Sequence, residues 1–143
     1  MDRLLVLAVV AAVAGLLAVL LQRWRPGGPV VTGWSVPGHL DRADFAEPNV
    51  PWLVAVFSST DCATCASMVA EAHTLASAQV VVQEVTAESA SDLHDRYQVD
   101  VVPMLVVADG DGLVRAHHLG PSAPGELQGL LEEARSSRSY DEP

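Results

Sequence analysis

Long apolar runs alternate with mixed polar segments along most of the chain, and the two patterns predict different elements. Continuous apolar runs of about six residues, bounded by proline, glycine or polar residues, are typical of strands that are covered on both faces. Segments with apolar side chains at spacings of three and four residues predict helices. The predicted strands lie at residues 52–57, 80–85, 99–108 and 113–119, with a short first strand at 30–32. The predicted helices lie at residues 62–77, 88–97 and 125–135, with one or two helical turns at 39–45.

The order of these elements predicts an α/β fold. Two strand–helix units are followed by a hairpin and a final helix, so we expect a central sheet of four or five strands with helices on both faces. The run at 52–57 is apolar throughout, which places it inside the sheet. The Asp-Gly-Asp-Gly sequence at 109–112 predicts the hairpin turn. Ser59 or Thr60 is expected to cap the first long helix, and Thr86 the second.

Residues 4–21 form an unbroken run of 18 residues drawn from Leu, Val, Ala and one Gly. As a helix this run would span roughly 27 Å, which is enough for the hydrocarbon core of a bilayer. Trp24 follows where an interfacial anchor belongs. The alternative is a cleaved signal peptide, but the run exceeds the usual apolar region of about 7–15 residues, and residues 22–25 offer no small-residue cleavage site. We therefore expect a single uncleaved transmembrane helix, and the few flanking arginines leave the membrane side of the following domain open.

The sequence accordingly divides into four parts. We expect a transmembrane anchor at residues 1–25, a linker with the first short elements at 26–49, a folded domain at 50–135 and a disordered polar tail at 136–143. The beginning of the linker is rich in glycine and proline, which favours an irregular chain.

Composition and charge exclude several classes of function. The chain of 143 residues has a net charge of −10; residues 1–25 carry +2, so the rest carries −12. Such an acidic body argues against binding to nucleic acid and against docking on anionic lipid by surface charge. The sequence contains no lysine, which excludes Schiff-base catalysis and a phosphate-loop lysine.

The only two cysteines, Cys62 and Cys65, lie where a predicted strand gives way to a predicted helix. At a helix N-terminus, free backbone N–H groups and the helix dipole favour a thiolate over a thiol, so Cys62 is a candidate nucleophile. Cys65 follows about one helical turn later, close enough for the two sulfurs to form a disulfide and open it again. The pair therefore predicts redox chemistry, with a permanent structural disulfide and half of a zinc site as the alternatives.

The histidines give the zinc alternative little support. A zinc site needs two further ligands, and His117 and His118 would point to opposite faces of a strand. His73 and His94 lie among polar residues on predicted helices and are expected to be solvated. Met68 and Met104 are expected in the core rather than at a metal, so no metal site is predicted.

Pro103 interrupts an otherwise apolar strand-like run. A proline removes a hydrogen-bond donor from a sheet and is tolerated mainly at the beginning or edge of a strand. A cis bond between Val102 and Pro103 would turn the backbone sharply. The N–H and C=O groups of Val102 would then be free to pair with a visiting peptide.

These motifs together resemble the thioredoxin superfamily, and within it the membrane-anchored thioredoxin-like proteins. The resemblance covers about residues 50–135 and is carried by the Cys62-Ala-Thr-Cys65 pair, the run at 97–103, the Asp-Gly-Asp-Gly turn and Gly120 before the last helix. Pro103 follows Cys62 by 41 residues, where the family has its cis-proline. The resemblance implies a thioredoxin-like fold with a central mixed sheet. It also implies Cys62 as the nucleophile, Cys65 as the resolving cysteine, and Val102 with Pro103 as the substrate-binding turn.

Four positions depart from the family pattern. Asp61 stands where thioredoxins usually have tryptophan, and Ala63-Thr64 replaces Gly-Pro between the cysteines. The family's buried aspartate, which shuttles the proton of the resolving cysteine, would fall at Val56, where no carboxylate can act. Asp61 also disfavours a second negative charge on Cys62. Asp61 and Thr64 are therefore candidate modulators of the pair, and we expect a dedicated enzyme with few clients rather than a general thioredoxin.

Two classes of function follow. The first is a membrane-tethered thiol–disulfide oxidoreductase that exchanges disulfides with protein clients, with a membrane electron donor as a further candidate partner and no cofactor. The second is a thioredoxin-fold binding or carrier module, for a protein partner, a metal or a haem precursor, with little or no redox turnover. An assay in which Cys62 and Cys65 are replaced one at a time separates the two classes.

Overall fold

The computed structural model describes residues 34–141 and the isolated Val13. Apart from Val13, the predicted membrane anchor at residues 4–21 lies outside the described residues, and so does the predicted short strand at 30–32. Within the described part of the chain, no helix combines the length and the apolar character needed to cross a bilayer.

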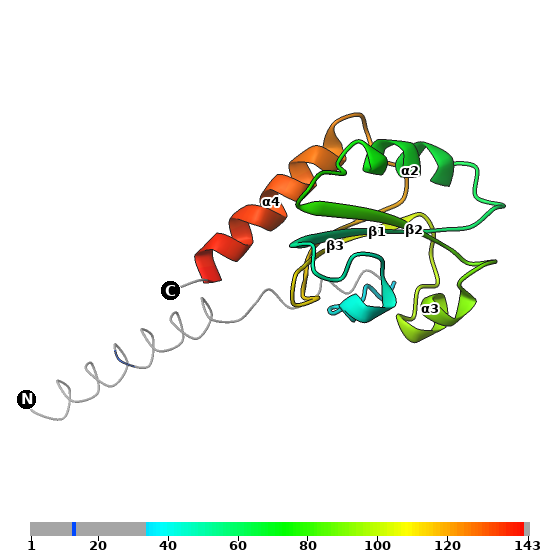
Figure 1. The fold of residues 1–143 in the computed structure, drawn as a ribbon. Coiled ribbons are helices and arrows are strands. Elements are labelled where there is room, and N and C mark those ends of the chain that lie inside the picture. Colours follow the sequence, from blue (N-terminus) through cyan, green and yellow to red (C-terminus); the bar gives the residue numbers. More distant parts are fainter. Residues whose placement is uncertain (1–12, 14–33, 142–143) are drawn as a thin grey trace, which may run out of the picture. The chain divides into compact units, whose positions relative to one another are not determined.

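A four-stranded mixed sheet forms the centre of the domain (Figure 1). Its strands are β1 (Trp52–Ser58), β2 (Val80–Thr86), β3 (Met104–Asp109) and β4 (Val114–Leu119). Their order across the sheet is β2-β1-β3-β4, with β1 and β2 parallel and the other two pairs antiparallel. All seven residues of β1 are buried. This confirms the prediction that the apolar run at 52–57 is an internal strand.

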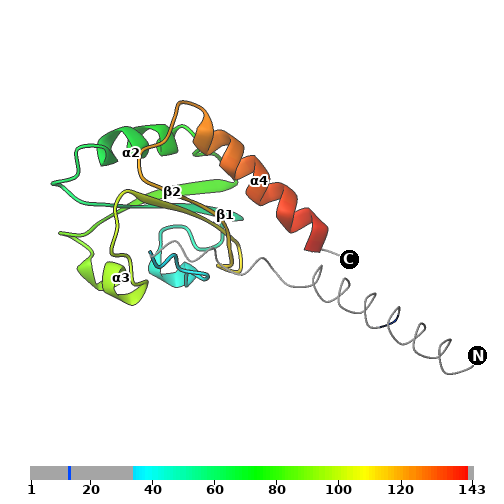
Figure 2. The ribbon, with the colours of Figure 1, turned by 180° about the vertical axis from the view of Figure 1, so that it is seen from behind.

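Helices cover both faces of this sheet, as predicted. The helices α2 (Cys65–His73) and α4 (Glu126–Asp141) lie on one face, while the short 3-10 helix η1 (Arg42–Asp44) and α3 (Ser91–Arg96) lie on the other (Figures 1 and 2). Alternate side chains of β1 supply the two cores. Leu53, Ala55 and Phe57 pack on the η1 and α3 side, whereas Val54 and Val56 pack with Met68 and Ala72 of α2.

The β3–β4 hairpin turns at residues 109–112, as its sequence predicts. The buried carboxylate of Asp109 accepts hydrogen bonds from the N–H groups of Asp111 and Leu113, both at 3.0 Å, and from Arg115 at 2.8 Å. Burial raises the pKa of Asp109, but Arg115 and the backbone donors outweigh it and hold that pKa below its usual range. The turn is therefore closed by its own first residue.

Helix boundaries differ from the prediction. The helix α2 begins at Cys65, not Cys62, and ends at His73, and neither Ser59 nor Thr60 caps it. The reason is that the N–H of Cys62 donates to the Ser59 carbonyl at 3.2 Å, and the N–H of Cys65 donates to the Cys62 carbonyl at 3.3 Å. These bonds span three residues and make turns instead of α-helix.

The other two helices also have different limits. The N-cap of α3 is Ala90, not Thr86, because the Thr86 carbonyl instead closes the preceding turn by accepting from Ser89 and Ala90. The final helix, α4, continues beyond residue 135 to Asp141.

The prediction that His94 is solvated is wrong. His94 is 8% exposed, its Nε2 lies 2.9 Å from the Val85 carbonyl oxygen, and its ring packs edge-on against Phe57 at 5.2 Å. His94 lies on the side of α3 that faces the sheet. Its ring fills the space there and has one hydrogen-bond partner, the Val85 carbonyl. His73, by contrast, is exposed as predicted.

Candidate active site

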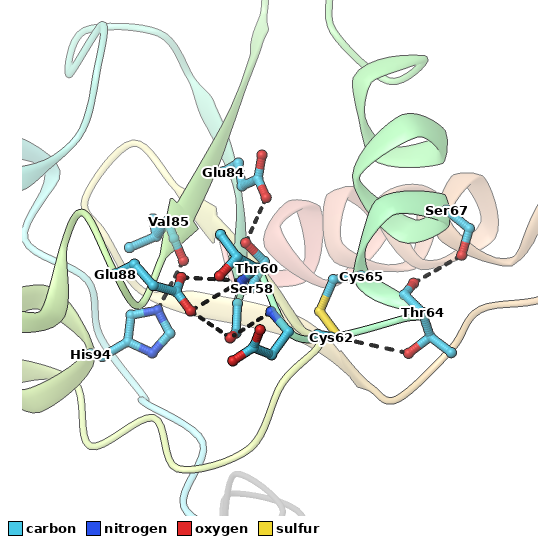
Figure 3. Close-up of a disulfide and its surroundings, with 12 residues drawn as sticks. Ser58, Thr60, Cys62, Thr64, Cys65, Ser67, Glu84, Val85, Glu88 and His94 are labelled. Atoms are coloured by element: carbon cyan, nitrogen blue, oxygen red, sulfur yellow. Dashed lines mark hydrogen bonds between the residues drawn. A yellow bond between two sulfur atoms is a disulfide. The ribbon is translucent and has the colours of Figure 1, made fainter.

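The two cysteines form a disulfide at the start of α2 (Figure 3). Their Cα atoms lie 5.4 Å apart, a usual separation for a disulfide. Cys65, the first residue of α2, is 3% exposed, whereas Cys62 lies in the preceding loop and is only half-buried. One sulfur can therefore be reached by a partner, and the other lies beneath the surface.

The N-terminal end of α2 favours negative charge at Cys62. Thr64 occupies the N-cap, but its side chain makes no capping hydrogen bond, and the first turn of the helix has no acidic residue. The Oγ1 atom of Thr64 lies instead 3.8 Å from Cys62 Sγ (Figure 3). The helix dipole and the hydroxyl of Thr64 can both stabilise a thiolate at this position. The modulating role of Thr64 stays a prediction, and this contact is its physical basis.

Glu88, in the segment after β2, holds the loop that leads to Cys62 (Figure 3). Its carboxylate accepts hydrogen bonds from Ser59 Oγ at 2.7 Å and from the Thr60 N–H at 3.1 and 3.2 Å. Ser59 Oγ in turn accepts a hydrogen bond from the N–H of Asp61 at 3.4 Å. The hydroxyl of Ser59 and the backbone N–H of Glu88 itself lower the pKa of Glu88 to about 2. Sequence reasoning missed Glu88, since nothing local in its sequence links it to residues 59–61.

The segments around Pro103 and Gly120 lie at the same end of the sheet as the cysteine loop. Met104 pairs with Phe57, so Pro103 lies beside the end of β1, from which the cysteine loop begins. The bond between Val102 and Pro103 is cis. The N–H of Gly120 donates to the Pro103 carbonyl at 2.9 Å and joins the end of β4 to this turn.

Val102 has the free backbone groups that the sequence predicts. Within the described residues, neither its N–H nor its C=O has a hydrogen-bond partner, and the residue is half-buried. Pro103 itself is buried. The cysteine loop, the Val102–Pro103 turn and Gly120 are therefore brought together, and an extended peptide could pair with Val102. The substrate-binding role of Val102 and Pro103 stays a prediction.

Val56, at the place of the family's buried aspartate, is fully buried on the α2 side of β1. Its neighbour in β2 is Glu84, whose carboxylate accepts a hydrogen bond from Ser58 Oγ at 2.6 Å (Figure 3). A carboxylate is thus present one strand away from Val56, but it is tied to a buried hydroxyl at the end of β1.

The histidines on β4 face opposite sides of the strand. His117 is exposed, whereas His118 Nδ1 lies 3.5 Å from a carboxylate oxygen of Glu126 and its Nε2 lies 3.2 Å from the Pro121 carbonyl oxygen. No cluster of three or more histidine, cysteine or acidic side chains in the part of the chain that the structure describes is arranged to hold a metal ion.

This geometry defines a class of protein: an α/β domain in which a Cys-x-x-Cys pair follows the central strand and a cis-proline lies at the same end of the sheet. The thioredoxin-like domain family matches residues 40–135. The chain belongs to this family, which agrees with the resemblance found in the sequence.

Solved structures show the same fold. A structure of a malarial protein is 14% identical, with a TM-score of 0.53, and the match covers 59% of this chain and 97% of that protein. Chloroplastic thioredoxin z, described as defining a type-specific target recognition, is 16% identical with a TM-score of 0.54, and the match covers 61% of this chain and 80% of that protein. At these identities the likeness is one of fold alone. No curated protein sequence matches the chain.

The site generates a prediction about the reactivity of the reduced pair. Cys62 should be alkylated first by iodoacetamide, because it is the more exposed sulfur and lies at the helix N-terminus. Asp61→Asn should lower the pKa of the Cys62 thiol and speed its alkylation at slightly acidic pH, because a neighbouring negative charge is removed. Alkylation rates measured against pH, with the labelled cysteine identified by mass spectrometry, check both statements. First labelling of Cys65 would show that the two roles are assigned the wrong way round.

Proposed function

We propose that this protein is a thiol–disulfide oxidoreductase that acts on protein clients and is tethered to a membrane by residues 4–21. The observation that carries the proposal is the asymmetric Cys62–Cys65 disulfide, with one reachable sulfur and one buried sulfur at the start of α2. Membership of the thioredoxin-like family supports redox chemistry of this general kind. A purely structural disulfide would gain nothing from a half-buried, reachable sulfur beside a helix N-terminus.

The reaction consists of two thiol–disulfide exchanges. The Cys62 thiolate attacks one sulfur of the client disulfide, the client S–S bond breaks, and a mixed disulfide forms while the leaving client sulfur takes up a proton. Cys65 then loses its proton to solvent and attacks Cys62 Sγ. The mixed disulfide breaks, the second client thiol leaves, and the Cys62–Cys65 disulfide forms. Two electrons pass to the client, and a partner dithiol must return them.

The surroundings of the pair suit these two steps. The free N–H and C=O groups of Val102 can hold the client backbone in an extended form next to Cys62. The Thr64 hydroxyl can donate a hydrogen bond to the Cys62 thiolate that attacks the client disulfide. Val56 provides no base for Cys65, so in this mechanism the proton of Cys65 passes to solvent.

Replacement of the resolving cysteine should trap the client. Cys65→Ser should accumulate a mixed disulfide between Cys62 and the natural client, because attack proceeds and resolution cannot. Cys62→Ser, the matched control, should trap little. Complexes isolated under non-reducing conditions and released by dithiothreitol measure this. If Cys62→Ser is the variant that traps clients, or if neither does, the alternative of a binding or carrier module with little redox turnover gains.

The membrane tether is tested by fractionation of the full chain. The 18-residue apolar run at 4–21 should keep the mature protein in the membrane pellet after carbonate extraction. A variant with two arginines placed in the middle of this run serves as the control and should leave the pellet, because charges there oppose insertion. Recovery of a soluble mature form that begins near residue 26 would instead identify the run as a cleaved signal peptide.

A further inference from the structure

We propose that Glu88 is a positioning residue for Cys62 and that its charge, together with that of Asp61, biases the Cys62–Cys65 pair toward giving electrons to its clients. This inference rests on the proposed oxidoreductase function, in which electrons pass to the client, and adds a physical cause for that direction. Its two parts are a clamp on the loop before Cys62 and a negative field at the reactive sulfur, and each can be tested separately.

The clamp is a set of linked hydrogen bonds on the loop before Cys62. Glu88 accepts from the Ser59 hydroxyl and the Thr60 N–H, and the Ser59 hydroxyl accepts from the Asp61 N–H. The Ser59 carbonyl then accepts from the Cys62 N–H at 3.2 Å. Residues 59–62 of the loop are thus fixed, directly or through Ser59, by the Glu88 side chain from the segment that follows β2.

The same contacts keep a negative charge near the reactive sulfur. Thr60 precedes Cys62 by two residues, which span at most about 7 Å, so the Glu88 carboxylate lies within about 10 Å of the Cys62 backbone. This is about one Debye length at 0.1 M salt, and Glu88 is exposed, so salt weakens the effect of this charge at Cys62 and low ionic strength strengthens it. Asp61 is exposed and adjacent to Cys62. Neither carboxylate forms an ion pair with any described residue, and the sequence has no lysine.

Other ionisable groups near this end of the sheet are held by their own partners. Glu84 of β2 is bonded to Ser58, His94 of α3 lies against the Val85 carbonyl, and His118 of β4 is paired with Glu126. The first turn of α2 carries no acidic residue, and Asp100, before the Val102–Pro103 turn, is exposed. Two influences therefore act on the charge at Cys62. The N-terminal end of α2 favours a thiolate, and the carboxylates of Asp61 and Glu88 oppose it.

This field acts on only one redox state. The disulfide is uncharged, whereas the reduced pair carries a thiolate at Cys62 when the pH exceeds the pKa of that thiol. Negative charges nearby raise the free energy of the thiolate and leave the disulfide unaffected, so they favour the disulfide product. A thioredoxin-fold oxidant has the opposite property, because its reduced form is stabilised. The pair should therefore give electrons to clients and end as the disulfide.

The experiment separates charge from clamp in the full-length protein. Glu88→Gln removes the charge but keeps a carbonyl oxygen that can accept from Ser59 and Thr60. Glu88→Ala removes both the charge and the clamp. Glu133→Gln, which neutralises an exposed carboxylate on α4, is the matched control. For each protein, the dithiol–disulfide equilibrium is measured in glutathione buffers at several pH values, and amide hydrogen exchange is measured at Thr60.

Above the pKa of the Cys62 thiol, Glu88→Gln should shift the equilibrium toward the dithiol by up to about threefold, which corresponds to about 14 mV. Below that pKa both redox states are uncharged at Cys62, so the shift should vanish. The Thr60 amide should stay protected in Glu88→Gln and exchange at least about tenfold faster in Glu88→Ala, and Glu133→Gln should match the wild type throughout.

An unchanged equilibrium in Glu88→Gln, or a shift of equal size at every pH, would overturn the electrostatic part. Unchanged Thr60 exchange in Glu88→Ala would overturn the clamp. Either result, obtained while Cys65→Ser still traps clients, would leave the oxidoreductase proposal standing. A pair that never equilibrates with glutathione would overturn that proposal itself.

Discussion

The site depends on the burial of one strand. All seven residues of β1 are buried, and β1 pairs with β2 on one side and with β3 on the other. Removal of this much apolar surface from water is the main stabilisation that such a small domain has. Because both neighbours are in register with β1, the end of this strand fixes the position of the cysteine loop. The same register brings the turn at Pro103 to that end.

Elements set by local pattern could be predicted from the sequence. The continuous apolar run of β1 indicates a strand covered on both faces. Asp109 closes the β3–β4 hairpin through hydrogen bonds to residues no more than six positions away. The start of α2 could not be predicted, because Ser59 and Thr60, which look like caps, bind instead to Glu88, 28 or 29 residues away in sequence. Burial of His94 was missed for a similar reason, since its partner is a carbonyl on β2.

The cysteine pair combines opposing influences that its sequence shows only in part. The helix N-terminus favours a thiolate at Cys62, as the motif alone suggests, and we propose that the Thr64 hydroxyl does so as well. Asp61 and Glu88 are the groups that we propose oppose it, and only Asp61 is adjacent to Cys62 in sequence. Cys65 is buried above a strand that offers valine in place of the family's aspartate. The result is a site with the geometry of a thioredoxin-like protein and a different electrostatic setting.

The central claim is that the Cys62–Cys65 disulfide is a working redox centre. Its most direct test is a continuous assay in which the full-length protein catalyses reduction of a fluorescently labelled peptide disulfide, with dithiothreitol as the electron source. The account predicts many turnovers per protein molecule for the wild type and only the uncatalysed rate for Cys62→Ser. Equal rates for the wild type and Cys62→Ser, with both proteins folded, would contradict it and make the disulfide a structural one.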